Sequence, residues 1–151
     1  QTYSEIYKIP TVALRFFTVY GPRQRPEMAI HLFTRLIMEG KPIPVFGDGS
    51  TARDYTYIDD IIDGVCRAML YDKTRFEIFN LGNSVTVKLS ELIEIIEKVT
   101  GRKAIIDRKP MQLGDVEITY ANIEKSNSLL SYRPESEIHE RISEFYKWFE
   151  T

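Results

Sequence analysis

The sequence has 151 residues, the size of one ordinary domain, and its 43% hydrophobic and 28% charged residues exclude a disordered chain. The formal net charge is −2, and because lysines and arginines are scattered, we expect no nucleic-acid-binding face. No apolar run approaches the roughly 20 residues of a membrane span. We therefore expect a cytoplasmic protein that binds neither nucleic acid nor membrane.

The few cysteines and histidines argue against two further kinds of site. Cys66 is the only cysteine, so no internal disulfide can form, and its place on the apolar side of a helical pattern predicts a core position. His31 and His139 are far apart in the sequence. Zinc sites in proteins take three or four cysteine, histidine or acidic ligands, so we expect no transition-metal site.

The first half of the chain mixes helix and strand signals. The opening residues are typical of the last turns of a helix that Pro10 ends, so we expect a fragment of a longer protein. The apolar, β-branched run Thr11–Gly21 predicts a buried strand. The patterns that follow predict a helix, two short strands and an amphipathic helix, over Met28–Gly40, Lys41–Gly47, Asp54–Ile58 and Ile58–Asp72.

The second half continues in the same way. Three strands are predicted over Phe76–Gly82, Val85–Leu89 and Ala104–Pro110. Three helices are predicted over Ser90–Gly101, Asn122–Leu130 and Ile138–Phe149, with Ser90 and Asn122 as N-caps. This mixed order of strands and helices, without an internal repeat, places the chain in the α/β class.

The segment GDGSTARDYTYIDD, Gly47–Asp60, carries four acids and one arginine and allows three interpretations. A calcium loop of the EF-hand type, counted from Asp48, needs glycine at its sixth position, where Arg53 stands and would repel the metal. A plain hairpin explains the turn residues, with Asp59 and Asp60 capping the next helix. The hairpin does not explain why an arginine opens the strand.

The third interpretation is a site for an anionic ligand. The guanidinium of Arg53 offers five donors in a fixed plane that suits phosphate oxygens. Arg23 and Arg25 lie in a loop before a helix that opens at Met28, and the free N–H groups of a helix N-terminus also favour anions. A diphosphate ligand fits this set, whereas the sequence assigns no role to Asp54.

The stretch MQLGD is a second candidate. Gln112 and Asp115 supply an amide and a carboxylate around Gly114, and a carboxylate suits a ribose diol, but an ordinary polar loop explains these residues as well. The chain has neither the G-x-G-x-x-G nor the P-loop fingerprint. Tyr3 and Lys8 are one residue too far apart for a Tyr-x-x-x-Lys pair, and the residues predict no pair of nucleophile and base.

Four blocks of the sequence, taken in order, resemble the extended short-chain dehydrogenase/reductase family, and within it the nucleotide-sugar epimerases and dehydratases. They are LRFFTVYGPRQRPEMA, PVFGDGSTARDYTYIDDI, FNLGN and PMQLGDVEITYA. The resemblance implies an NAD-binding Rossmann part, a catalytic Tyr-x-x-x-Lys pair and a C-terminal substrate domain. By this resemblance, residues 1–21 are the tail of the Rossmann domain, with its last strand, and residues 22–151 bind the nucleotide sugar. The catalytic pair would lie upstream of Gln1.

The same resemblance implies binding roles for individual residues. Phe16 and Phe17 would lie beside the nicotinamide of NAD. The UDP-sugar substrate would be held by Thr18, Met28, Ala29, Val45, Phe46, Gly47, Arg53, Gln112 and Asp115.

Within this set the roles differ. Arg53 would bind the diphosphate and Asp115 the ribose, while Val45–Gly47 would border the uracil. Thr18 and Gln112 are the residue types of the glucuronate-type branch.

The functional hypothesis is therefore a fragment of an NAD-dependent UDP-sugar 4-epimerase of the UDP-glucose or UDP-glucuronate type. The fragment would anchor UDP while the whole enzyme inverts C4 through a 4-keto intermediate, and it would be inactive alone. The same domain of a 4,6-dehydratase or decarboxylase is one alternative, and a non-catalytic nucleotide-binding module is another. Since members of the family are commonly dimers, we expect the whole protein to be a homodimer.

Overall fold

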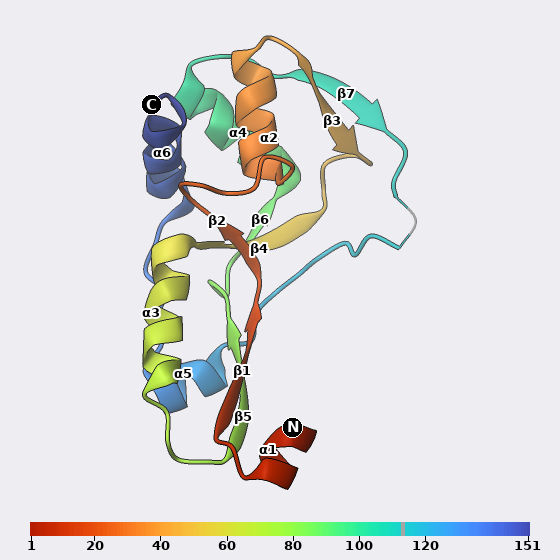
Figure 1. Ribbon diagram of the computed structural model, residues 1–151. Coiled ribbons are helices and arrows are strands. Elements are labelled where there is room, and N and C mark those ends of the chain that lie inside the picture. Colours follow the sequence, from red (N-terminus) through yellow and green to blue (C-terminus); the bar gives the residue numbers. More distant parts are fainter. Residues whose placement is uncertain (113) are drawn as a thin grey trace.

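The computed structural model describes residues 1–112 and 114–151 and confirms an α/β arrangement of short elements (Figure 1). In chain order they are α1 (Thr2–Tyr7), β1 (Thr11–Phe16), β2 (Thr18–Tyr20), α2 (Ala29–Met38), β3 (Pro42–Phe46), β4 (Ala52–Tyr57), α3 (Ile58–Met69), β5 (Phe76–Leu81), β6 (Thr86–Lys88), α4 (Leu89–Thr100), β7 (Ile105–Lys109), α5 (Glu124–Leu130) and α6 (Ile138–Phe149).

The strands form three small sheets. β1 pairs with β5 and β3 with β7, both in parallel, while β4 lies between β2 (parallel) and β6 (antiparallel). The single strand predicted over Thr11–Gly21 is two strands in the structure, because the chain changes its partner strand at Phe17. Before Phe17, β1 pairs with β5; after it, β2 pairs with β4. The backbone N–H of Phe17 still donates to the carbonyl of Leu81, at 3.1 Å, which extends the first pairing by one residue. Phe17 therefore sits at the carboxyl ends of β1 and β5.

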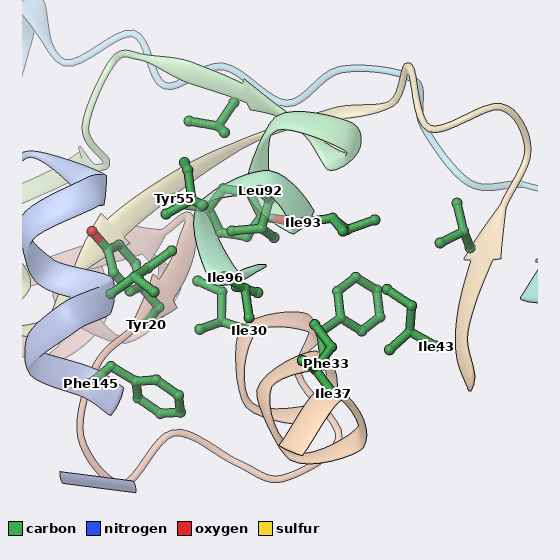
Figure 2. Close-up of a cluster of buried hydrophobic side chains, with 14 of the residues drawn as sticks. Tyr20, Ile30, Phe33, Ile37, Ile43, Tyr55, Leu92, Ile93, Ile96 and Phe145 are labelled. Atoms are coloured by element: carbon green, nitrogen blue, oxygen red, sulfur yellow. The ribbon is translucent and has the colours of Figure 1, made fainter. Parts of the chain in front are cut away.

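One end of the molecule has a closed apolar core, which we call the helical region: α2, α4 and α6 together with β3 and the ends of β2 and β4 (Figure 1). Its side chains interdigitate from all of these elements (Figure 2). The largest fully buried ones here are Tyr20, Phe145, Ile30, Ile37, Ile43, Leu92, Ile95, Ile96 and Ile142. The predicted helices over residues 28–40, 90–101 and 138–149 supply most of this core, as their apolar periodicity requires.

The other end, which we call the strand region, consists of β1, β5, α1, α3 and α5 and has a smaller core (Figure 1). Phe79 and Leu81 of β5 are buried against α3 and Tyr132. The strand Thr11–Gly21 was predicted to be buried, but β1 is only half-buried and ends in the exposed Phe16, because within the described part of the chain β5 is its one partner strand.

The prediction that Cys66 lies in the core is wrong: it is exposed. α3 packs through the side that carries Gly64, where an added Cβ would lie only 2.8 Å from Leu81. The helix approaches the strand closely there and buries Ile61 and Ala68 on the same side as Gly64, so the opposite side of the helix faces outward. The apolar side chains of Ile62 and Met69 are accordingly exposed, with Cys66 between them.

Two predicted N-caps are not formed. α4 begins at Leu89, with Lys88 at its N-cap, so Ser90 already lies inside the helix. Asp59 and Asp60 lie in the first turn of α3 rather than at its cap, where their charge still favours the positive end of the helix dipole.

The predicted N-cap at Asn122 is wrong as well, because the N-cap of α5 is Ile123 and no side chain caps this helix. Asn122 lies one residue earlier, where its Oδ1 accepts the backbone N–H of Glu124 at 3.0 Å. None of the helices in the described residues is long and apolar enough to span a bilayer.

Candidate nucleotide-sugar site

Two cavities meet where the helical and strand regions join. The larger, of about 680 Å³, lies at the end of β1 and along β2 and the loop that follows, and is lined by Arg15, Phe16, Phe17, Thr18, Val19, Tyr20, Gly21, Pro22, Arg23, Gln24, Arg25, Met28, Ile58 and Thr119. The smaller, of about 320 Å³, is lined by Thr18, Gln24, Glu27, Met28, Ala29, Leu32, Phe33, Pro44, Phe46, Thr51, Arg53, Tyr55, Leu89 and Asp115. Three residues, Thr18, Gln24 and Met28, line both, so one extended ligand can reach from one cavity into the other.

The structure brings most of the residues named from the sequence to these cavities. Phe16 and Phe17 line the larger one, Thr18 and Met28 line both, and the smaller one receives Ala29, Phe46, Arg53 and Asp115. Val45, Gly47 and Gln112 line neither.

The side chain of Val45 points into the core and is 2% exposed. Along β3 the buried Ile43 and Val45 alternate with Pro44 and Phe46, which line the smaller cavity. This is the ordinary alternation of side chains along a strand. Any contact between Val45 and a ligand would therefore involve its backbone.

Arg53 and Asp115 meet at the mouth of the smaller cavity. Nη2 of Arg53 donates to Oδ1 of Asp115 at 2.6 Å, and their side chains are 21% and 34% exposed. Nη1 donates to the carbonyls of Ala52, at 3.0 Å, and Glu117, at 3.3 Å. The guanidinium is thus held in place at the cavity by three acceptors, which orients it before any ligand arrives.

The loop before α2 has the backbone conformation of a tight turn. Gly21 and Arg23 both have positive φ, at 138° and 65°, and the N–H of Gln24 donates to the carbonyl of Gly21 at 3.1 Å. The Gln24 side chain fixes the loop to β2 by donating to the carbonyl of Val19 at 2.9 Å. A non-glycine residue with positive φ costs energy, so the backbone at Arg23 is held there by its surroundings.

The N-terminus of α2 opens onto the smaller cavity at Met28 and Ala29. No acidic side chain lies in the first turn of α2, and no side chain caps it. A helix start of this kind leaves backbone N–H groups available to an anion. Together with Arg53, it gives the cavity two sources of positive potential.

Tyr55 adds a neutral donor to the same wall. Burial raises the pKa of its phenol to about 12, an effect that the nearby charge of Arg53 opposes. The phenol therefore stays protonated at neutral pH and can donate a hydrogen bond.

The described residues contain no group of three or more histidine, cysteine or acidic side chains that could bind a metal ion.

Sequence reasoning missed the role of Asp54. Its carboxylate is fully buried, at 0% exposure, and accepts four hydrogen bonds from Thr56, Asn83, Ser84 and Ala121. The one available signal was an acid at the start of the predicted strand Asp54–Ile58, whose other residues are aromatic or β-branched. The sequence could not show which donors reach it, because two of its partner segments lie about 30 and 67 residues away.

Comparison with known proteins shows the family to which the chain is similar. The family model described as "NAD dependent epimerase/dehydratase family" matches residues 1–82, just over half of the chain. The UDP-glucuronate 4-epimerase of Thermodesulfobacterium geofontis is 40% identical over 148 residues, which cover 97% of this chain and 45% of the relative.

Solved structures of UDP-sugar 4-epimerases are also similar to this chain. The UDP-glucuronic acid 4-epimerase from Bacillus cereus, in complex with UDP-glucuronic acid and NAD, superimposes with a TM-score of 0.92 at 36% identity, over 99% of this chain and 48% of that one. The UDP-glucose 4-epimerase of Thermotoga maritima with UDP-glucose gives a TM-score of 0.91 at 28% identity, over 99% of this chain and 48% of that one. The chain thus spans about half the length of the relatives it matches.

Proposed function

Because the chain belongs to the NAD dependent epimerase/dehydratase family, we propose that it supplies the UDP-binding part of an NAD-dependent UDP-sugar 4-epimerase. The observation that carries this proposal is the Arg53–Asp115 pair beside the N-terminus of α2, at the mouth of the smaller cavity. A guanidinium and free helix N–H groups suit a diphosphate, and an adjacent carboxylate suits the hydroxyls of a ribose.

In this proposal the UDP lies in the smaller cavity and the sugar reaches the larger one. Arg53 and the N–H groups of α2 hold the diphosphate, Asp115 accepts from the ribose hydroxyls, and Phe46 packs against the uracil. Such contacts remote from the reacting carbon hold the sugar where it can react.

The larger cavity fits part of a nicotinamide as well. Phe16 and Phe17 stand at the carboxyl ends of β1 and β5, where ligands of open parallel sheets bind, and offer flat apolar surface. NAD, held mainly by residues outside this chain, supplies the hydride acceptor and donor for C4 inversion. The catalytic Tyr-x-x-x-Lys pair and the homodimer remain predictions about the whole protein.

The charge around the larger cavity favours an anionic sugar. Arg15, Arg23 and Arg25 line it, and the described lining residues include no aspartate or glutamate. Arg25 contacts Glu27 at 3.3 Å, but Glu27 lies on the side of the smaller cavity. A carboxylate on the sugar would meet this excess positive charge, so we propose UDP-glucuronate over UDP-glucose as the substrate.

The proposal is tested with the full-length protein that contains this chain, incubated with UDP-glucuronate and NAD. The expected product is the C4 epimer, identified by NMR of the sugar ring, and UDP-glucose should turn over less well. A 4-keto-6-deoxy product formed from UDP-glucose would identify a dehydratase, and release of CO₂ from UDP-glucuronate would identify a decarboxylase. Binding of UDP-glucuronate without any turnover would support the alternative that the protein is a non-catalytic nucleotide-binding module.

A further inference from the structure

Asp54 is a buried charge without a cationic partner among its hydrogen-bonding neighbours. Its Oδ1 accepts from the hydroxyl of Thr56, at 3.0 Å, and the N–H of Asn83, at 2.8 Å. Its Oδ2 accepts from the N–H groups of Ser84, at 2.9 Å, and Ala121, at 3.1 Å. A group that receives four donors must be an acceptor at both oxygens, which a carboxylate is and an amide is not.

These bonds join three segments that are distant in the sequence. β4 contributes Asp54 and Thr56, the turn after β5 contributes Asn83 and Ser84, and the chain beyond residue 114 contributes Ala121. The turn is shaped for this contact, because Ser84 has a positive φ of 57°. Successive N–H groups in such a turn can point toward one anion.

The third segment, residues 114–121, is bound along β4 by the three consecutive residues 52–54. Ala52 donates to the carbonyl of Glu117, at 2.8 Å, and its carbonyl accepts from the N–H of Thr119, at 3.1 Å. Arg53 contacts Asp115 on the cavity side. Asp54 binds the far end of the segment twice, through the Ala121 N–H at its carboxylate and through its own N–H to the Thr119 hydroxyl, at 3.2 Å.

This segment contributes to both halves of the proposed site. Asp115 lines the smaller cavity and Thr119 the larger one. Arg53 and Asp54 point to opposite faces of β4, as neighbours on a strand do, so Asp54 lines neither cavity. Its influence on a ligand must therefore act through the segment that it holds.

We propose that Asp54 is a positioning residue of the nucleotide-sugar site: its buried carboxylate fixes residues 119–121 to the turn at 83–84, and thereby sets the places of Asp115 and Thr119. This inference rests on the proposed function. It assigns the RDY stretch two different tasks: Arg53 faces the cavity, where the ligand is proposed to bind, and Asp54 holds the neighbouring segment 119–121 from the interior. Small displacements of positioning groups are known to cost large factors in binding and rate.

The test compares Asp54→Asn with Asp48→Asn in the full-length protein. Asp48 undergoes the same substitution in the preceding turn, where its Oδ1 accepts one N–H, from Ser50, at 2.9 Å and is exposed. Asn at position 54 keeps the shape of the side chain but presents N–H groups to donors. We expect Asp54→Asn to weaken UDP binding at least roughly tenfold by calorimetry, while Asp48→Asn stays within about twofold of the wild type.

Both variants are measured at a temperature at which circular dichroism shows them to be folded. A purely structural role would lower the melting temperature of Asp54→Asn and leave the UDP affinity of the folded protein unchanged, and that result would overturn the inference. The amide exchange of Ala121, Ser84 and Asn83 should accelerate in Asp54→Asn, relative to amides of α6. Unaltered exchange at these three positions would equally contradict it.

The wild type offers a second test in case Asp54→Asn does not fold. Saturating UDP should slow amide exchange over residues 115–121 and at Ser84 by several-fold, with little change in α6. If UDP binds and these amides do not respond, the segment is not coupled to the ligand and the inference fails alone. If UDP does not bind the wild type, the proposed function fails and the inference falls with it.

Discussion

The helical region and the strand region differ in how completely they bury their apolar side chains. In the helical region Phe145 is 0% exposed and packs against α2 and the neighbouring aromatic rings. In the strand region Met69 is 79% exposed, and Tyr3, Tyr7 and Phe16 also present large apolar surfaces. The contrast follows from the sheets, because among the described residues β1 and β5 pair only with each other, whereas β2, β3 and β4 are packed under three helices.

The difference indicates which part of the site this chain can form by itself. The walls of the smaller cavity come mainly from α2, β3 and β4, which belong to the closed helical region. The larger cavity rests on the exposed end of β1 and the loop after β2. We infer that the half of the proposed site that would anchor UDP is well formed in this chain, and that the half proposed for the sugar and the nicotinamide depends more on the rest of the protein.

The largest effect that would test this contrast is on stability. Phe145→Ala removes a fully buried aromatic ring and should lower the free energy of unfolding by about 3–5 kcal/mol, measured by urea denaturation. Met69→Ala removes a long apolar side chain from the open face of α3 and should change it by less than about 0.5 kcal/mol. Similar losses in both variants would mean that the face of α3 around Met69 is covered in solution.

A smaller effect concerns the ion pairs at the surface of the helical region. Arg141 lies over the ring of Tyr57, at 4.8 Å, and donates to both oxygens of Glu144. The Arg141 guanidinium, with a further hydrogen bond from Tyr57, holds the pKa of Glu144 below its ordinary value near 4.5. A carboxyl with a lowered folded-state pKa contributes stability above its ordinary pKa and loses that contribution as the pH falls through the lowered value.

Glu144→Gln should therefore cost less than about 1 kcal/mol at pH 7, since the Glu144 side chain is nearly half exposed and solvent screens the pair. The difference from the wild type should persist down to about pH 4.5 and disappear below it. Denaturation curves of the two proteins between pH 7 and pH 3 measure this directly. A cost that is the same at pH 3 and pH 7 would mean that packing, and not the charge of Glu144, is responsible.

The helices of the helical region could be predicted from the sequence, because the spacing of apolar residues within each segment is enough to indicate a helix and its bounds. The last helix has the predicted bounds Ile138–Phe149, and α2 differs from its prediction by two residues or fewer at each end. The side on which α3 packs could not be predicted in this way. Its apolar residues cover a wide arc, and the choice of side depends on the close contact of Gly64 with Leu81, which is a long-range fact.

The site shows the same limit. Strand alternation in β3 could have indicated that Phe46 and Val45 point to opposite sides, since this needs only the period of a strand. Arg53 and Asp115 are 62 residues apart, so their pairing could not be predicted from the sequence around Arg53 or from the sequence around Asp115. Nor could the four donors of Asp54, since they arrive from three segments that only the fold brings together.

The proposed role of Arg53 in UDP binding is tested by a calorimetric titration of UDP into the full-length protein and its Arg53→Ala variant. We expect the wild type to bind UDP and Arg53→Ala to lose about 1.5–3 kcal/mol of binding free energy, a factor of roughly 10 to 150 in Kd. Arg53→Lys should lie between them, because it keeps the charge but not the planar fork. Since Arg53 also binds Asp115 and Glu117, the affinities are compared in proteins shown to be folded. An unchanged Kd in Arg53→Ala would contradict the account.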